Sequence, residues 1–134
     1  MVRGECNCGV VAFEIDATLA DVFVCHCSIC RRFTGANGVA VAIAANNAFR
    51  WVRGEDVIAS WKKPDADWVA HFCRTCGSTL PGPNDDDDRM FIPVGLISEG
   101  GESLKVAHHI WVGSKANWDE IGDAGKLHHE AFGT

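Results

Sequence analysis

Seven cysteines fall into three short motifs, and none of them stands alone. Cys6–Cys8 reads C-x-C, Cys25–Cys30 reads C-x-C-x-x-C, and Cys73–Cys76 reads C-x-x-C. In an extended segment residues i and i+2 point to the same face, so a C-x-C pair aims both sulfurs at one ion. In C-x-x-C the chain turns back, and both thiolates reach about 2.3 Å from one zinc ion. The motifs therefore predict metal ligation by thiolates.

The seven thiolates divide most simply into a group of four and a group of three. The first group holds Cys6, Cys8, Cys73 and Cys76, and the second holds Cys25, Cys27 and Cys30. Three ligands within six residues are expected to share one ion, and the two remaining pairs then close a four-thiolate site. Structural zinc is usually four-coordinate, whereas catalytic zinc keeps a position for water or substrate. We expect one closed structural zinc and one open, catalytic zinc that a thiol substrate enters as thiolate.

Other arrangements of the same thiols stay open at this point. Cys6/Cys8 could join Cys25/Cys27 and leave Cys30 with the Cys73–Cys76 pair, or a thiolate-bridged cluster could hold both ions. A redox dithiol fits Cys73–Cys76 alone, which leaves five cysteines unexplained. His26 is a candidate fourth ligand, but alternation turns its side chain away from the ion that its neighbours share.

The net charge of the chain limits the classes of partner that it is expected to bind. The formal net charge is −6, and no basic stretch is concentrated enough to hold a phosphate backbone, so we expect no nucleic-acid partner. Arg31 and Arg32 follow directly on the central cysteine motif. They either offset the thiolate charge or bind the carboxylates of an anionic substrate, for which arginine offers bidentate geometry.

The elements that must position these cysteines are mostly strands. Apolar residues alternate with period two over 10–15, 39–43 and 68–72, and shorter strand patterns occur at 22–24, 49–52, 57–61, 90–94 and 105–112. Turn signals separate these runs, and together they predict a mainly β domain. Helices are expected only over Ser28–Phe33 and Lys115–Glu120.

A chain of 134 residues has the size of one domain, and we expect residues 1–134 to form one, with about 119–134 as a looser tail that includes His128 and His129. Met1–Gly9 lacks the apolar core of a signal peptide, and the longest uncharged run, Gly35–Ala48, contains three asparagines. We expect a cytoplasmic protein with no membrane partner. Asn84–Asp88 reads NDDDD, which indicates an exposed acidic loop without the ligand spacing of a calcium site.

Four stretches give the chain a family resemblance: GECNCGVVAFE from Gly4, CHCSICRRFTGA from Cys25, HFCRTCGSTL from His71 and HHIWVGSKANWDEI from His108. In these stretches the chain resembles the glutathione-dependent formaldehyde-activating enzymes, which include relatives of centromere protein V. The acidic loop and the tail after Trp118 depart from the family pattern.

The resemblance implies a small zinc-binding fold of several coiled antiparallel β-sheets, related to methionine-R-sulfoxide reductase B. It implies structural zinc at Cys6, Cys8, Cys73 and Cys76, and catalytic zinc at Cys25, Cys27 and Cys30. The implied activity is that of a carbon–sulfur lyase, which joins glutathione and formaldehyde into S-(hydroxymethyl)glutathione. The alternative is a zinc-stabilised binding module, or a glutathione carrier, without catalysis.

Overall fold

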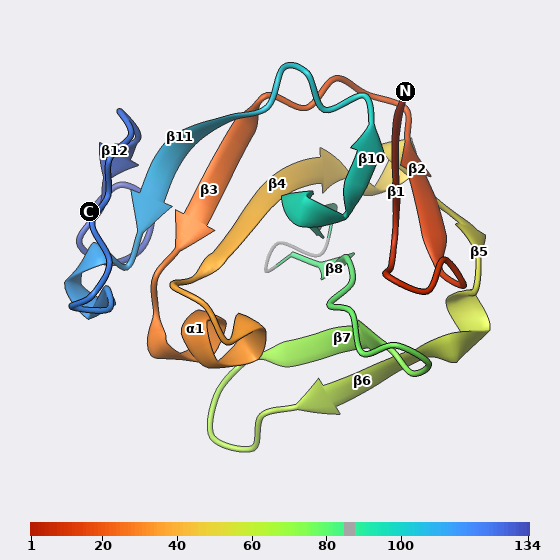
Figure 1. The fold of residues 1–134 in the computed structure, drawn as a ribbon, viewed down its shortest axis with the longest axis horizontal. Helices are drawn as coiled ribbons and strands as arrows, with labels where there is room; N and C mark the ends of the chain where they lie inside the picture. Colours follow the sequence, from red (N-terminus) through yellow and green to blue (C-terminus); the bar gives the residue numbers. More distant parts are fainter. Residues whose placement is uncertain (85–87) are drawn as a thin grey trace.

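The computed structural model describes residues 1–84 and 88–134, which form three β-sheets and one short α-helix (Figure 1). The four-stranded sheet has the order β10-β1-β2-β5. Its strands are β1 (Val2–Glu5), β2 (Ala12–Ile15), β5 (Phe49–Arg53) and β10 (Ile97–Glu99). All of its strand pairs are antiparallel. The N-terminus therefore lies beside a strand that is almost 100 residues away along the chain.

The six-stranded sheet has the order β12-β11-β3-β4-β9-β8. Its strands are β3 (Asp21–Cys25), β4 (Val39–Ala45), β8 (Gly82–Pro83), β9 (Arg89–Pro93), β11 (Lys105–Ile110) and β12 (Lys126–Leu127). The pairs β3–β4, β4–β9 and β8–β9 are antiparallel, whereas β11 runs parallel to both β3 and β12. The expectation of a mainly β fold with several antiparallel sheets is confirmed, and the two parallel pairs are an addition to it.

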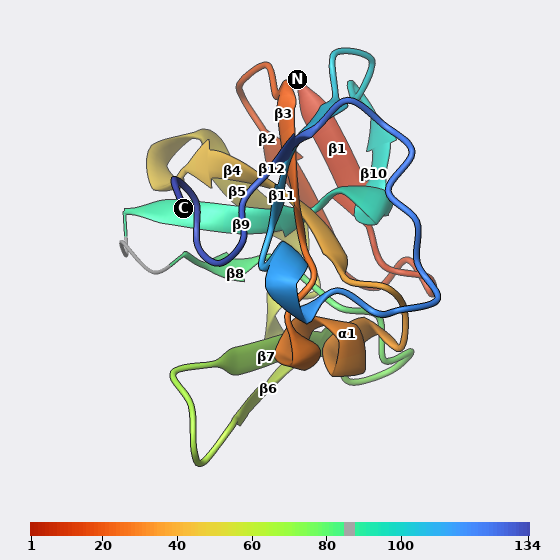
Figure 2. The same cartoon turned by 90° about the vertical axis from the view of Figure 1, so that its left-hand side faces the viewer.

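The third sheet is the hairpin of β6 (Ile58–Lys62) and β7 (Val69–Cys73). In both views this hairpin lies beside α1 (Ser28–Thr34), the helix expected over 28–33 (Figures 1 and 2). Single 3₁₀ turns link other elements: η1 (Asn46–Ala48), η2 (Glu55–Val57), η3 (Val94–Leu96) and η4 (Val112–Ser114). No helix in the described part of the chain is long and apolar enough to cross a membrane.

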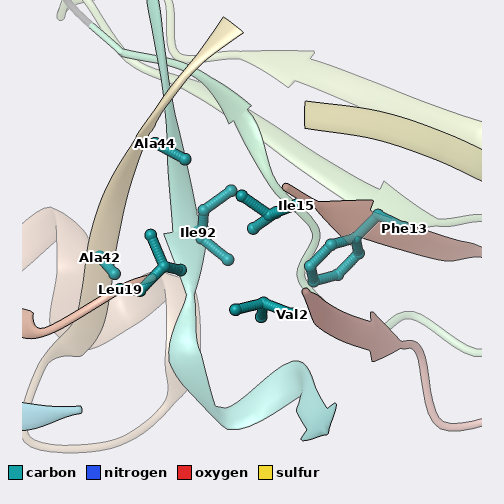
Figure 3. Close-up of a cluster of buried hydrophobic side chains, with 7 residues drawn as sticks. All are labelled: Val2, Phe13, Ile15, Leu19, Ala42, Ala44 and Ile92. Carbon is teal, nitrogen blue, oxygen red and sulfur yellow. The ribbon is translucent and has the colours of Figure 1, made fainter. Parts of the chain in front are cut away.

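The main core lies between the two larger sheets (Figure 3). Phe13 of β2 is 1% exposed, stacks on Phe49 at 5.5 Å and meets Trp51 edge-on. Ile92 of β9 is fully buried opposite it. The buried residues of this core alternate with more exposed ones along the sequence. Each of the two sheets therefore buries one face against the other.

Two expectations about the C-terminal region change. The prediction of a helix over Lys115–Glu120 is wrong. The nearby 3₁₀ turn η4 ends at Ser114, and residues 115–120 form a turn and irregular structure. The region after 119, expected as a looser tail, contains the short strand β12, and its His128 is buried, with 1% exposed. The expected acidic loop lies in part outside the described residues, because 85–87 are not among them.

His128 holds the end of the chain against β11. Its Nδ1 accepts the backbone N–H of Gly133 at 3.0 Å, so the proton of the neutral ring is on Nε2, which lies 3.0 Å from His108 Nδ1. The ring of Phe132 lies 5.0 Å from that of His128. Burial, together with the neighbouring His108, lowers the pKa of His128 below the usual 6.5.

This arrangement predicts release of the C-terminal residues in acid. A released His128 binds a proton more tightly than the docked one, so the docked state is most stable above about pH 6.5 and loses stability as the pH falls through the depressed pKa. Proton NMR of the Phe132 ring should show its signals moving toward random-coil positions between pH 7 and pH 5. His128→Gln should remove this pH dependence and the exposed His129→Gln should keep it; signals that stay fixed down to pH 5 would contradict the docking argument.

Candidate metal centres

Four sulfurs from two distant turns meet at one point. Their ligand atoms all lie within 4.8 Å of one another, and they belong to Cys6, Cys8, Cys73 and Cys76. Cys6 Sγ lies 3.6 Å from Cys8 Sγ, and Cys8 Sγ lies 3.8 Å from Cys73 Sγ. A tetrahedron with zinc–sulfur bonds of about 2.3 Å has edges of about 3.8 Å, whereas a disulfide needs about 2.05 Å. The group therefore has the dimensions of a four-thiolate metal site.

Two glycine-bearing turns shape this group. Gly9 donates its N–H to Cys6 O at 3.0 Å, and Gly77 donates to Cys73 O at 2.7 Å. Both glycines have positive φ, 75° and 78°, which other residues adopt only with strain. The Val11 N–H also points at Cys6 Sγ from 3.4 Å, as a donor that stabilises a thiolate. The backbone thus aims the sulfurs inward before any ion is considered.

Ser78 adds a further donor at this group. Its hydroxyl accepts the Asn7 N–H at 3.0 Å and lies 3.2 Å from Cys76 Sγ, which donates to it as a thiol and accepts from it as a thiolate. The side-chain and backbone hydrogen bonds of Ser78, together with those of Cys8, lower the pKa of Cys76 to about 5. A cysteine that is thiolate at neutral pH is ready to bind a metal cation.

The second group contains the sulfurs of Cys25, Cys27 and Cys30, which also lie within 4.8 Å of one another. Cys25 ends β3, Cys27 caps the N-terminus of α1, and Cys30 lies in the first turn of that helix. Cys27 Sγ accepts the Cys30 N–H at 3.4 Å. Hydrogen bonds from Cys25 and Cys30 and from the helix backbone lower the pKa of Cys27. The hydrogen bonds with Cys25 and Cys27 and burial raise the pKa of Cys30, so the negative charge of the group is carried by Cys27.

The two groups differ in closure. In the described part of the chain, no histidine, aspartate or glutamate joins the three-sulfur group as a fourth ligand. Cys25 and Cys27 are half-buried and Cys30 is buried, whereas the four-sulfur group contains the exposed Cys8 and the half-buried Cys76. The two groups therefore differ in the number of their ligands and not in their exposure to solvent. All seven cysteines are free thiols, and the sulfurs are grouped in space as four and three. This spatial grouping matches the division into four and three and not the mixed pairings that the sequence left open.

His26 points away from the sulfurs and starts a buried polar chain. Its Nε2 lies 2.8 Å from His109 Nδ1, and His109 Nε2 lies 2.8 Å from a carboxylate oxygen of Asp123. The carboxylate requires a proton on His109 Nε2, so His109 Nδ1 accepts the proton that His26 Nε2 donates. The two imidazoles are only 1% and 4% exposed. This chain fixes the peptide between Cys25 and Cys27 from the inside of the protein.

A second carboxylate lies on the other side of His26. Asp119 Oδ2 is 3.7 Å from His26 Nδ1, which makes no hydrogen bond, and it accepts the Asn37 side-chain amide at 3.3 Å. Burial lowers the pKa of His26 and keeps its ring neutral. Sequence reasoning missed the roles of Asp119 and Asp123, because neither shares a motif or a spacing with the cysteines.

The two arginines occupy the last turn of α1, where their charge complements the helix dipole. Arg31 is half-buried, and its Nε is a buried donor without a hydrogen-bond partner. Arg32 is exposed and lines a hollow on the hairpin side of the helix. The two arginine side chains therefore have different surroundings. Both belong to the short helix that carries Cys30.

One known protein family matches most of the chain. The family model described as "Glutathione-dependent formaldehyde-activating enzyme" matches residues 1–114. The chain belongs to this family. The match includes all seven cysteines and both arginines, and Asp119 and Asp123 lie beyond it.

Two relatives are consistent with the family match. A Halomonas elongata protein named "Putative glutathione-dependent formaldehyde-activating enzyme" is 29% identical over 86 residues, which are 60% of this chain and 54% of that protein. The chain thus spans about half the length of this curated relative. The crystal structure of a Rhodobacter sphaeroides protein superposes with a TM-score of 0.60 at 28% identity, covering 76% of this chain and 97% of that one.

Gly38 offers a test of the backbone that supports the three-sulfur group. A Cβ at this glycine would lie 2.3 Å from Cys25 O, so Gly38→Ala must push the end of β3 away from β4. We expect the free energy of unfolding to fall by about 1–3 kcal/mol, as for other overpacked sites. Urea denaturation measures it, with Gly95→Ala as the matched control, because a Cβ there meets nothing within 4 Å. Equal stability of the two variants would show that this close approach is unimportant.

Proposed function

We propose that each sulfur group holds one zinc ion and that the two ions have different roles. The four-sulfur group matches a closed tetrahedral site in its edge lengths, and it connects the turn after β1 to the end of β7. Closing a loop of that length strongly restricts the unfolded chain, so the first ion is structural. The three-sulfur group leaves a coordination position for a ligand from outside.

The proposed reaction is the addition of the glutathione thiol to formaldehyde. The S–H adds across the C=O bond: a carbon–sulfur bond forms, and the proton ends on the aldehyde oxygen to give S-(hydroxymethyl)glutathione. Zinc bound at Cys25, Cys27 and Cys30 would lower the pKa of an incoming thiol. In the reverse direction the same step is a carbon–sulfur lyase reaction.

The protein's own contribution is to hold the open site in one geometry. The Cys30 N–H and the helix N-terminus face Cys27 and stabilise its negative charge. The buried histidine chain fixes the segment between Cys25 and Cys27. Arg31 and Arg32 are the proposed partners of the glutathione carboxylates, because both are cations on the helix that carries Cys30.

One observation carries the proposal: three cysteine sulfurs share one place without a fourth protein ligand among the described residues. Family membership then supplies the substrates, since the family description names glutathione and formaldehyde. A binding module with two structural ions would need a fourth protein ligand at this group.

Removal of one ligand from each group should have different consequences. Cys76→Ser is expected to lower the free energy of unfolding by more than about 3 kcal/mol, because zinc binding at a structural site is part of folding. Cys30→Ser should keep the fold and lose one zinc per chain. Metal analysis and urea denaturation measure both effects, with exposed Thr75→Ser as the control beside Cys76. The reverse pattern would show that the structural and open sites are exchanged.

The reaction itself is tested by NMR exchange spectroscopy of glutathione with formaldehyde. The zinc-loaded protein should speed the exchange by at least about tenfold over buffer, which corresponds to about 1.4 kcal/mol off the barrier. Cys30→Ser serves as the matched control and should give the buffer rate. Exchange at the buffer rate with both zincs present would end the reaction claim, and two ions equally inert to chelator would favour the binding module.

A further inference from the structure

A hollow of about 250 Å³ lies between α1 and the β6–β7 hairpin. Its apolar walls are Ile29 and Phe33 of the helix and the two indole rings of Trp61 and Trp68. Residues i and i+4 of a helix share one face, so Ile29 and Phe33 present one continuous surface to the hairpin. Both ribbon views place the helix beside this hairpin (Figures 1 and 2).

The walls are flat and partly fixed. The Trp68 ring lies edge-on to Phe33 at 5.2 Å and parallel to Phe91 within 24°, so its orientation is set by two neighbours. Trp61 is 54% exposed and makes no ring contact with the described aromatic residues. An apolar ligand that covers the exposed indole is favoured by about 25 cal/mol for every Å² of apolar surface that it removes from water. Such walls favour a planar apolar molecule.

The same hollow has a cationic rim. Arg32 and Lys63 both line it, although the whole chain carries a net charge of −6. Lys63 Nζ already lies 2.7 Å from Asp65, whereas Arg32 forms no ion pair within the described parts of the chain. An exposed guanidinium without a carboxylate, next to flat apolar walls, suits the carboxylate of a ligand.

We propose that this hollow binds a small organic anion with a flat apolar body, of the arylalkyl carboxylate class. The ring enters between Trp61 and the Phe33–Trp68 wall, and the carboxylate faces Arg32. The site is built on the same helix as Cys30, but its ligand binds to aromatic and cationic side chains and not to sulfur. It shares Arg32 with the proposed glutathione site, and its other lining side chains have no part in the proposed reaction.

The probe is 3-phenylpropionate, titrated into the zinc-loaded protein while the tryptophan indole N–H signals are followed by NMR. We expect the signals of Trp61 and Trp68 to shift in a saturable way, with assignments from Trp61→Phe and Trp68→Phe. The matching amine, 3-phenylpropylammonium, should bind at least about tenfold more weakly, because its charge faces Arg32. Shifts confined to other tryptophans, or equal binding of the amine, would overturn the proposal.

Variants separate charge from shape. Arg32→Gln should weaken 3-phenylpropionate about tenfold and leave the neutral 3-phenylpropanol unchanged. Lys105→Gln removes an exposed cation outside the hollow and should change neither. Trp61→Ala, at a half-exposed position, should weaken both ligands.

The Cys30→Ser variant should bind 3-phenylpropionate as tightly as the unchanged protein. This result distinguishes the hollow from a site where the carboxylate binds to the open zinc. Loss of binding in that variant would overturn the separate site. An unchanged affinity in Arg32→Gln would overturn the role of the guanidinium.

Discussion

The fold depends on a meeting of sulfurs from two turns that are far apart in the chain. Cys6 and Cys73 are 3% and 0% exposed, and they pack in one cluster with Val11 and Leu80. Four sulfurs within 4.8 Å of one another repel one another as thiolates unless a cation lies between them, and the repulsion is strongest at the buried Cys6 and Cys73. Core packing therefore brings the sulfurs into the geometry that the proposed zinc ion requires.

That meeting point also sets where the second group lies. It attaches the β6–β7 hairpin, through Cys73 at its end, to the four-stranded sheet that starts at Val2. With the hairpin fixed there, α1 packs beside it and presents Cys27 and Cys30 on one side and Arg32 on the other. The four-sulfur group thus joins the hairpin to the four-stranded sheet, whereas the three-sulfur group lies where β3 meets α1.

The sequence predicted most where periodicity and spacing act locally. The strand patterns at 39–43 and 105–112 correspond to β4 and β11, and Ser28–Phe33 corresponds to α1. Spacing favoured the grouping of Cys25, Cys27 and Cys30, because three ligands within six residues can hardly diverge, but it left the partners of the other two pairs open. Strands β1 and β10 were missed, since Val2–Glu5 and Ile97–Glu99 are too short to show alternation and form by pairing with each other across the chain.

The polar chain behind the open group was beyond sequence reasoning for a different reason. His26 and His109 come together because β11 pairs in parallel with β3, a long-range contact that no local pattern reports. Asp123 accepts a hydrogen bond from His109, and the Asp119 carboxylate lies 3.7 Å from His26 Nδ1 without bonding to it. Both residues come from 115–120, where the expected helix does not form, or from the irregular segment directly after it. A helix there would have directed these side chains by its own period, whereas the irregular chain lets each one reach the buried rings.

The position of these carboxylates outside the family match has a physical meaning. Residues 1–114 carry all the sulfurs, but the histidine between Cys25 and Cys27 is held by a region that follows them. A buried imidazole left without a partner would cost about 1–3 kcal/mol. In this chain Asp123 accepts the hydrogen bond of His109, and β12 and His128, a few residues further on, pack on β11. The rigidity of the open sulfur group is thereby linked to the docking of the C-terminal region, although no cysteine lies within it.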